Sequence, residues 1–212
     1  MSRLSPYWLW LVLALPALAM TNELLTSNSP RIYHILVHPT GEFSARFMII
    51  SMMATPLMLL FKGWRGPRWL RKNRRYFGVA AFAYAAAHTI FYLIDKASLD
   101  RILMELPRLY IWTGWLAFAI FIPLAVTSMD CFMRILGPNW KTLQRTTYVA
   151  AVLTLVHWAA LHKWSGVVPA MVHFGPLIAL EAYRIWYWYL RPSRRRSKET
   201  VEKPAIADTL TP

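Results

Sequence analysis

The sequence is poor in acidic residues and in cysteine. Only 10 of its 212 residues are Asp or Glu, and a single cysteine, Cys131, is present. One thiol excludes an internal disulfide framework and a metal site built from several cysteines. There is also no glycine-rich phosphate loop, no nucleophile elbow, no pair of carboxylates suited to hydrolysis and no repeat at a fixed period. The chemistry must therefore come from other residues.

What the sequence has instead is long apolar runs. Charged residues make up only 16% of the chain and apolar residues 57%, whereas soluble domains average about 25% charged. A bilayer core of about 30 Å needs about 20 helical residues, or fewer where the bilayer thins. The runs cover residues 7–20, 45–61, 77–94, 109–127, 147–161 and 167–190. We therefore predict an all-α bundle of six transmembrane helices over 1–191, followed by a basic, disordered tail over 192–212.

The net charge of +14 is distributed unevenly. Of the 24 Lys and Arg residues, 18 lie in segments expected on one side of the membrane. These segments are the amino terminus, the second and fourth connections, and the tail. This bias places both termini in the cytoplasm. Topology and contacts with lipid headgroups account for the basic clusters, so we exclude a nucleic-acid partner. The first run, with its basic start and Ala17-Leu18-Ala19, also has features of a cleavable signal, but cleavage would leave the later spans in the same orientation.

Two histidines lie inside apolar runs. His88 and His157 each lie 11 residues beyond the start of their predicted spans, near 77 and 146. Both spans run outward, so each imidazole lies about 16 Å from the inner boundary. Polar side chains at this depth are costly and tend to mark function. Either one could simply bond a neighbouring backbone carbonyl.

Two histidines at matched depth favour a shared ligand. They can supply both axial nitrogens of a heme iron, and alanines in both spans leave room for the macrocycle; zinc would need further ligands. We therefore expect heme b, with His88 and His157 as metal ligands. The remaining histidines are expected to be solvated or at the membrane boundary: His34 and His38 in an outer connection over 21–44, and His162 and His173 at the outer ends of their spans.

Three stretches carry a resemblance to a known family, over roughly residues 40–164. They are "TGEFSARFMI" followed by "ATPL", "LRKNRRYFGVAAFAYAAAH", and "TSMDCFMRILGPNWKTLQRTTY". They resemble the heme-binding membrane subunit of the periplasmic protein-methionine-sulfoxide reductase system, within the ferric-reductase-like transmembrane family. By this resemblance, His88 and His157 are the heme-binding histidines.

The resemblance also implies a role and partners. The chain would be a multi-pass protein of the bacterial inner membrane, an electron-transfer subunit rather than a catalytic one. Its donor would be the quinone pool or a cytoplasmic flavin reductase. Its acceptor would be a periplasmic molybdopterin-dependent methionine sulfoxide reductase. FMN is implied by the resemblance alone.

One position departs from the family pattern. Gln144 stands where the family has a further histidine, and the matching inner position of the third span is Arg74 or Arg75. A second bis-histidine heme is therefore not supported. Gln144, Arg74 and Arg75 remain candidates for an inner flavin or quinone site, although topology alone explains the arginines. Two other interpretations stay open: a self-sufficient transmembrane ferric reductase, and a heme-free scaffold or transporter.

Overall fold

The computed structural model describes residues 6–191, without the side chains of Pro6 and His162. Every regular element in this part of the chain is helical. The elements are α1 (Pro6–Thr26), α2 (Ile32–Leu60), α3 (Arg65–Lys96), α4 (Leu99–Glu105), α5 (Leu109–Val126), α6 (Asp130–Leu136), α7 (Asn139–Gln144), α8 (Thr147–Ala159), α9 (Leu161–Trp164), α10 (Val167–Ile185) and the wider π-helical turn η1 (Trp186–Leu190). The predicted all-α class is confirmed for these residues. The tail predicted over 192–212 lies outside them.

Within residues 6–191, four helices are long and apolar enough to cross a membrane: α1, α2, α3 and α5. The predicted fifth span is shorter than expected, because α8 has 13 residues and a length of about 20 Å. Neither α8 nor α10 meets the same length and hydropathy criteria. The six-span count therefore stays a prediction.

Two predicted connections are wrong. The outer connection predicted over 21–44 shrinks to residues 27–31, because α1 continues to Thr26 and α2 begins at Ile32. His34 and His38 therefore lie on the first turns of α2 rather than in a loop. On the other side, α3 begins at Arg65 and includes most of the basic segment. Hydropathy locates only the part of a helix in the bilayer core, whereas the backbone continues wherever its hydrogen bonds can be kept.

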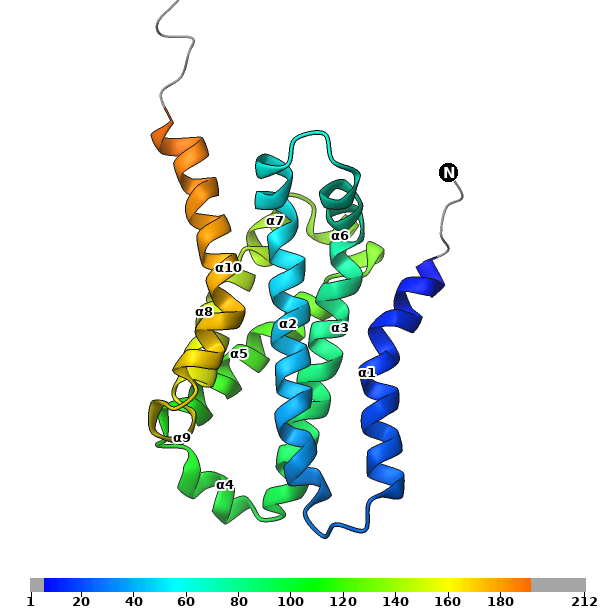
Figure 1. Cartoon of the computed structure of the whole chain (residues 1–212), viewed down its shortest axis with the longest axis vertical. Helices are drawn as coiled ribbons and strands as arrows, with labels where there is room; N and C mark the ends of the chain where they lie inside the picture. The colour runs from blue at the N-terminus through cyan, green and yellow to red at the C-terminus, as the bar shows by residue number, and fades with distance from the viewer. Residues whose placement is uncertain (1–5, 192–212) are drawn as a thin grey trace, which may run out of the picture.

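The helices form an upright bundle (Figure 1). α2 and α3 pack extensively as an antiparallel pair, α5 packs on α8, and α10 packs on α2 and α8. The connection between α2 and α3 lies at one end of the bundle with α6 and α7, which we call the inner end. α4, α9 and the connection between α1 and α2 lie at the opposite, outer end. Both ends of the described chain lie toward the inner end, as an even number of crossings requires; that this end is cytoplasmic stays a prediction.

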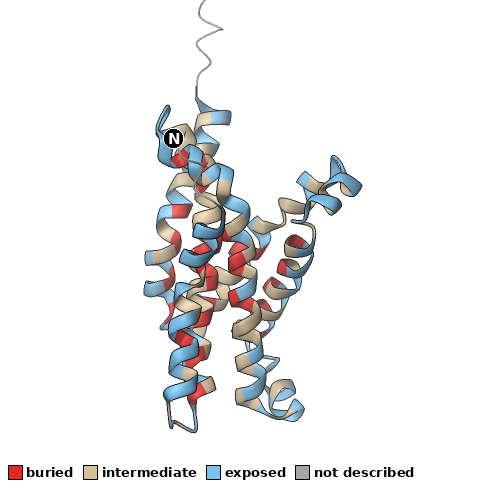
Figure 2. Ribbon diagram, turned by 90° about the vertical axis from the view of Figure 1, so that its right-hand side faces the viewer, coloured by how far each residue is buried: buried red, intermediate tan, exposed pale blue. Residues whose placement is uncertain are grey.

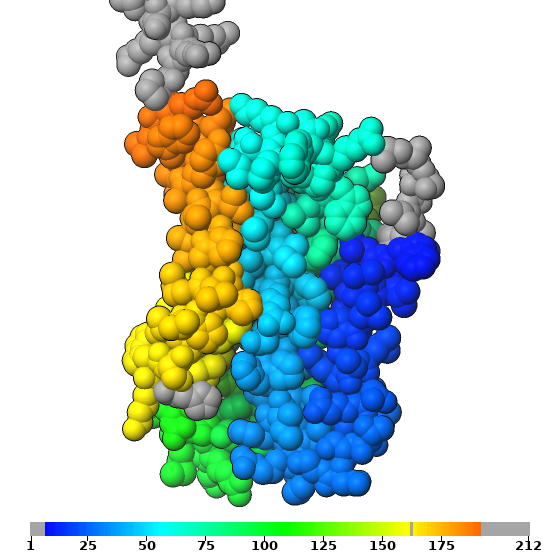
Figure 3. Space-filling model, viewed as in Figure 1, coloured from blue at the N-terminus to red at the C-terminus, as the bar shows by residue number. Residues whose placement is uncertain are grey.

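The core runs along the middle of the bundle. Buried residues gather where helices meet, and the outward faces are exposed (Figure 2). Many of the exposed residues are large and apolar, including Leu15, Ile90, Ile122 and Val152. Such faces suit a surrounding of lipid. In the space-filling view, α1 and α10 flank α2 on either side (Figure 3).

A buried tyrosine, Tyr84, joins α1 to α3 by hydrogen bonds. The N–H of Ala17 donates to the Tyr84 hydroxyl at 2.8 Å, and this hydroxyl donates to the Leu13 carbonyl at 2.9 Å. In an unbroken helix the Ala17 N–H would bond to the Leu13 carbonyl directly. The Tyr84 hydroxyl is therefore inserted into the α1 ladder, next to Pro16, which has no N–H to donate.

We expect Tyr84→Phe to destabilise the protein by about 1–2 kcal/mol, since it removes two hydrogen bonds from an apolar surrounding. Tyr189→Phe is the matched control, because Tyr189 is 79% exposed. Unfolding of both variants in mixed micelles, followed by circular dichroism, measures the difference. Equal stability of the two variants would contradict the role of Tyr84.

Candidate functional site

The structure brings the two intramembrane histidines together. His88 comes from α3 and His157 from α8, and their ring centroids lie 6.1 Å apart with the ring planes at 87°. An imidazole nitrogen binds a metal at about 2 Å and lies about 1 Å from its own ring centroid. Two imidazoles on opposite sides of one iron therefore have centroids about 6 Å apart. The observed spacing matches that arrangement.

Each imidazole is held by a backbone carbonyl of a neighbouring helix. Nδ1 of His88 lies 2.8 Å from the carbonyl oxygen of Val37 on α2. Nδ1 of His157 bonds to the carbonyl oxygen of Tyr110 on α5. A carbonyl only accepts, so Nδ1 carries the proton in both rings and Nε2 keeps its lone pair. Histidines that ligate a metal are oriented by hydrogen bonds of this kind.

A glycine lies against each imidazole. A Cβ added at Gly41 would lie 2.9 Å from Nδ1 of His88, and one added at Gly114 would lie 2.7 Å from Nδ1 of His157. Real Cβ atoms are essentially never found closer than 3.0 Å. Because glycine has only a hydrogen atom in place of a side chain, each imidazole ring can lie against the helix that holds it.

A cavity of about 100 Å³ lies beside the two rings. Its lining is mostly apolar, with small residues from α2, α3 and α5 and an aromatic group formed by Tyr92, Trp115, Phe118 and Phe121. Among the alanines of α3 and α8 expected to make room for a macrocycle, only Ala85 lines this cavity. Ala80, Ala150 and Ala151 are buried in the core, where small residues let helices approach closely.

Sequence reasoning missed how the two halves of the site correspond. The segments that hold the histidines read Leu36-Val37-His38-Pro39-Thr40-Gly41 and Leu109-Tyr110-Ile111-Trp112-Thr113-Gly114. Both follow the pattern Leu-x-x-x-Thr-Gly. In both, the second residue supplies the carbonyl and the last supplies the glycine. A search for repeats at a fixed period overlooks this pattern, because a six-residue segment that occurs only twice does not define a regular repeat.

The other three predicted site residues line a second, larger cavity near the inner end. It has a volume of about 530 Å³ and is lined by Arg74, Arg75 and Gln144. Segments from α2, α3, α5, α6, α7 and α8 contribute to it, and Phe121 contributes to both cavities. The structure thus divides the predicted site residues into an outer pair and an inner group.

Gln144 does not lie on the helix that carries His157. It ends α7, and a turn at residues 145–146 separates it from α8. Its amide nitrogen lies 3.3 Å from the Leu124 carbonyl and 3.4 Å from the Thr127 hydroxyl, at the end of α5. Gln144 therefore satisfies polar groups at the end of a helix, and its side chain also lines the inner cavity.

The inner cavity is strongly basic. Its lining includes Arg71, Lys72, Arg74, Arg75, Lys141 and Arg145. One acid, Asp130, also lines it and pairs with Arg75 at 2.5 Å. The remaining positive charge suits an anionic or electron-rich ligand.

The outer mouth of the site carries its own charged cluster. Glu105 accepts hydrogen bonds from Tyr92 at 3.1 Å, Lys96 at 2.8 Å and Arg108 at 3.2 Å. Burial of the Glu105 carboxylate opposes its ionisation, but these donors and charges outweigh burial and lower its pKa. Since Tyr92 also lines the outer cavity, this cluster ties α4 to the cavity rim.

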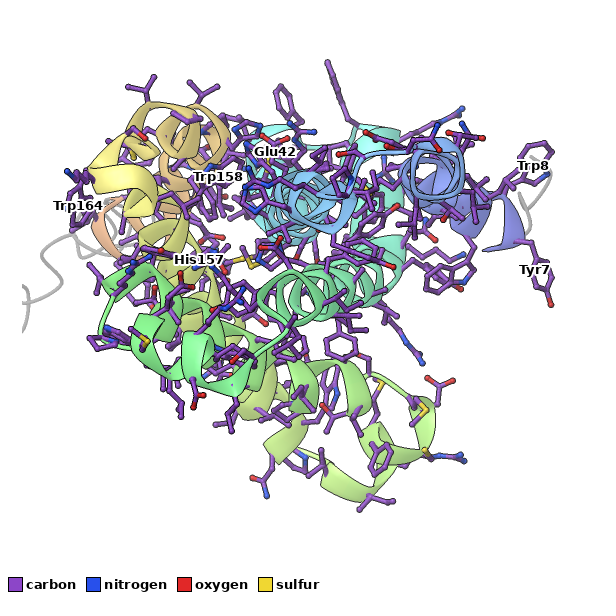
Figure 4. All side chains as sticks on the ribbon, turned by 90° about the horizontal axis from the view of Figure 1, so that it is seen from below. Tyr7, Trp8, Glu42, His157, Trp158 and Trp164 are labelled. Atoms are coloured by element: carbon purple, nitrogen blue, oxygen red, sulfur yellow. The ribbon has the colours of Figure 1, made fainter. Side chains whose placement is uncertain are left out.

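Of the remaining histidines, His38 lies close to His88, because it directly follows Val37 on α2, whereas His34 and His173 make their contacts elsewhere. His34 lies 3.2 Å from Asp95 and is half exposed. His173 accepts from Arg46, which also pairs with Glu42, and its ring packs on Trp158 at 4.8 Å. In the view from the outer end, Trp158 lies toward α10 (Figure 4), whereas His157 bonds to α5. The side chain of His162, expected at the outer end of its span, lies outside the described part.

The two site glycines offer a direct test of the geometry. In a helix, Gly→Ala ordinarily stabilises by up to about 1 kcal/mol. At Gly41 and Gly114, however, the new methyl group must displace an imidazole, and overpacking costs about 1–3 kcal/mol. We expect either variant to bind the predicted heme about 5- to 150-fold more weakly while remaining folded.

Titration of the purified variants with hemin, followed by absorbance, measures this loss. Gly175→Ala in α10 is the control, because its added Cβ meets nothing within 4 Å. If Gly41→Ala and Gly114→Ala both bound hemin as tightly as the control, heme binding would not depend on the close packing of glycine against each imidazole.

Comparison with known proteins agrees with this architecture. Residues 40–155 match the family described as "Ferric reductase like transmembrane component". The chain is 31% identical to the protein-methionine-sulfoxide reductase heme-binding subunit MsrQ of Azospira oryzae, over 84% of this chain and 76% of that protein. It is 33% identical to the subunit of the same name from Xanthomonas euvesicatoria, over 79% and 76%. No solved structure is significantly similar to the chain. The chain therefore belongs to the ferric reductase-like transmembrane family and is a relative of these heme-binding subunits.

Proposed function

We propose that this chain is a membrane-embedded b-type heme electron-transfer subunit. The observation that supports this most strongly is the pair of imidazoles, 6.1 Å apart between ring centroids, whose Nδ1 atoms are both held by backbone carbonyls. In this arrangement both Nε2 atoms are available as axial ligands. The relatives in Azospira and Xanthomonas are named heme-binding subunits, which agrees with this assignment.

The donor set favours a macrocycle over a bare metal ion. Within residues 6–191, no group of three or more His, Cys, Asp and Glu side chains lies close enough to hold a metal by itself. Two imidazoles alone leave a metal without equatorial ligands, and a porphyrin supplies four nitrogens. When bound, heme iron carries one electron at a time by alternating between its ferric and ferrous states.

The outer cavity must widen to accept the macrocycle. Its volume of about 100 Å³ is below the range of about 300–1,000 Å³ typical of ligand pockets. Trp115 and Phe118 line it and are only partly buried, so their rings can turn toward the lipid. His88 and His157 are held by backbone groups and keep their places. The aromatic rings would then cover the macrocycle and exclude water.

The inner cavity is the proposed site of electron entry. It is basic, it is larger than the outer cavity, and it shares Phe121 with it. A quinone headgroup or a flavin would find hydrogen-bonding groups in Gln144 and positive charge in Arg74 and Arg75. We propose the quinone pool or a cytoplasmic flavin reductase as donor, with FMN as one cofactor that this cavity would suit.

Electrons would leave at the outer end. The acceptor that we propose is a periplasmic, molybdopterin-dependent methionine sulfoxide reductase, in keeping with the relatives' name as heme-binding subunits of a protein-methionine-sulfoxide reductase. The chain would then lie in the bacterial inner membrane, with six spans and both termini in the cytoplasm. It would be the electron-carrying subunit of an oxidoreductase system and not its catalytic subunit.

The absorption spectrum of the purified chain tests the proposal. We expect a Soret band and, on reduction, a sharp alpha band. His88→Ala and His157→Ala should each abolish the low-spin spectrum, because loss of one axial nitrogen leaves the iron five-coordinate. His34→Ala and His38→Ala are the controls and should keep it.

Two outcomes would redirect the assignment. A colourless wild-type chain would favour the heme-free scaffold, in which the histidines only bond between helices. A coloured chain that reduces ferric chelates rapidly without any partner would favour a self-sufficient ferric reductase. An unchanged alpha band in His88→Ala would refute the pairing of the two imidazoles.

We expect Gln144→Ala to keep its full heme content, because Gln144 lines only the inner cavity. If Gln144 bonds a quinol headgroup, its loss removes a hydrogen bond of about 0.5–1.5 kcal/mol and slows reduction of the heme by quinol about two- to twelvefold. Reduction by dithionite should be unchanged. Stopped-flow absorbance measures both rates.

Asn139→Ala is the control for Gln144→Ala, because Asn139 begins the same short helix and does not line the inner cavity. Equal quinol rates in the two variants would mean that Gln144 only caps the end of α5. Loss of heme from Gln144→Ala would contradict ligation by the two histidines alone.

A further inference from the structure

The site contains two buried hydroxyl groups that the proposed ligation does not use. Among the described residues, Thr40, Ser44 and Thr113 are the buried polar side chains, and the two threonines are only 1% and 2% exposed. Ser44 donates to the Ala81 carbonyl and thereby joins α2 to α3. Thr40 and Thr113 occupy the same place in the two Leu-x-x-x-Thr-Gly segments. Their burial and their repetition call for a common explanation.

Each threonine shares a carbonyl with a site histidine. The Thr40 hydroxyl lies 2.7 Å from the Leu36 carbonyl and 2.9 Å from the Val37 carbonyl, which also accepts from His88. On α5, the Thr113 hydroxyl lies 2.7 Å from the Leu109 carbonyl and 3.3 Å from the Tyr110 carbonyl, which also accepts from His157. Each hydroxyl has a single hydrogen, so its bond is shared between the two carbonyls, and part of it reaches the carbonyl that orients the imidazole.

Two other threonines show that this sharing is specific. Thr89 and Thr154 also line the outer cavity, and their hydroxyls donate to the carbonyls of Ala85 and Ala150 at 2.9 and 2.8 Å. In the described part of the chain, imidazoles bond instead to the carbonyls of Val37, Tyr110 and Pro169. A threonine hydroxyl that bonds to its own helix is thus ordinary. Within the described chain, only Thr40 and Thr113 also reach a carbonyl that accepts a hydrogen bond from a histidine.

Hydrogen bonding to a carbonyl changes what that carbonyl does to the imidazole. A second donor draws electron density from the oxygen and weakens the bond from Nδ1–H. The ring then has less imidazolate character and donates less charge through Nε2. A weaker axial donor stabilises ferric iron less, so the reduction potential rises.

We propose that Thr40 and Thr113 are a matched pair of positioning residues that raise the reduction potential of the bound heme by sharing the carbonyls that orient His88 and His157. The inference rests on the proposed ligation by these two histidines. A higher potential favours reduction of the heme by a quinol, because a quinol is a weaker reductant than a reduced flavin. Thr40 has the larger influence, since its hydroxyl is nearer to the shared carbonyl.

The test is the midpoint potential of the heme in Thr40→Val and Thr113→Val, measured in the detergent-purified full chain by spectroscopic redox titration. Valine keeps the shape of threonine and removes the hydroxyl. We expect a more negative potential in both, a larger shift for Thr40→Val, and a nearly additive shift in the double variant. Thr40→Ser and Thr113→Ser keep a hydroxyl and should restore the wild-type potential.

Thr21→Val and Thr26→Val in α1 are the controls, because these hydroxyls also donate to carbonyls of their own helix but line neither cavity, and they should leave the potential unchanged. Unshifted potentials in the Thr40 and Thr113 variants, or equal shifts in the controls, would overturn the proposal. Loss of heme from the valine variants but not from the serine variants would support a role of the hydroxyl in setting the ligands. Loss from both would show a packing role alone and would overturn the proposal.

The wild-type spectrum separates this inference from the function on which it rests. A wild-type chain that binds no heme would refute the proposed function itself. A heme-loaded wild type whose potential is insensitive to all of these substitutions would refute only the role of the threonines. Electron paramagnetic resonance of the oxidised variants adds a second readout, because the g values of low-spin ferric heme report the axial ligand field.

Discussion

The site depends on two hydrogen bonds from imidazole to backbone. Carbonyls of α2 and α5 hold the rings of His88 and His157 by Nδ1, and so fix the tautomer, the ring planes and the direction of Nε2. A carbonyl in a helix cannot move without the helix, so these bonds make the ligand geometry a property of the bundle. The packing of α2 on α3 and of α5 on α8 is what maintains it.

The same packing explains why the site is made of two matching halves. In each half, one helix carries the histidine and its partner supplies a carbonyl, a glycine and a buried threonine. The glycine allows the close approach, and the threonine acts on the carbonyl. Two short, similar segments placed on opposite sides of one cavity thus give similar surroundings to both nitrogens. The basic cavity at the inner end lies beyond Phe121, separate from the histidines.

Much of the fold followed from composition. Apolar runs located most of the helices, and the pairing of His88 with His157 was expected from their matched depth. The boundaries were less accurate, because α2 and α3 extend beyond the apolar stretches into segments that carry histidine, glutamate or arginine. Gln144 is also not continuous with the helix of His157, since a turn at 145–146 interrupts the backbone helix. Residue spacing converts to distance only along an unbroken helix.

The sequence by itself determined the membrane environment and which titratable side chains lie within it, because burial in lipid depends on hydropathy summed over long runs. It also determined the family, through motifs close to the histidines. Only the tertiary structure decided which carbonyls hold the imidazoles, why a side chain at Gly41 or Gly114 would collide with an imidazole, and that Arg74, Arg75 and Gln144 share a cavity. Those facts are contacts between helices distant in the chain, and their geometry exists only after the helices have packed.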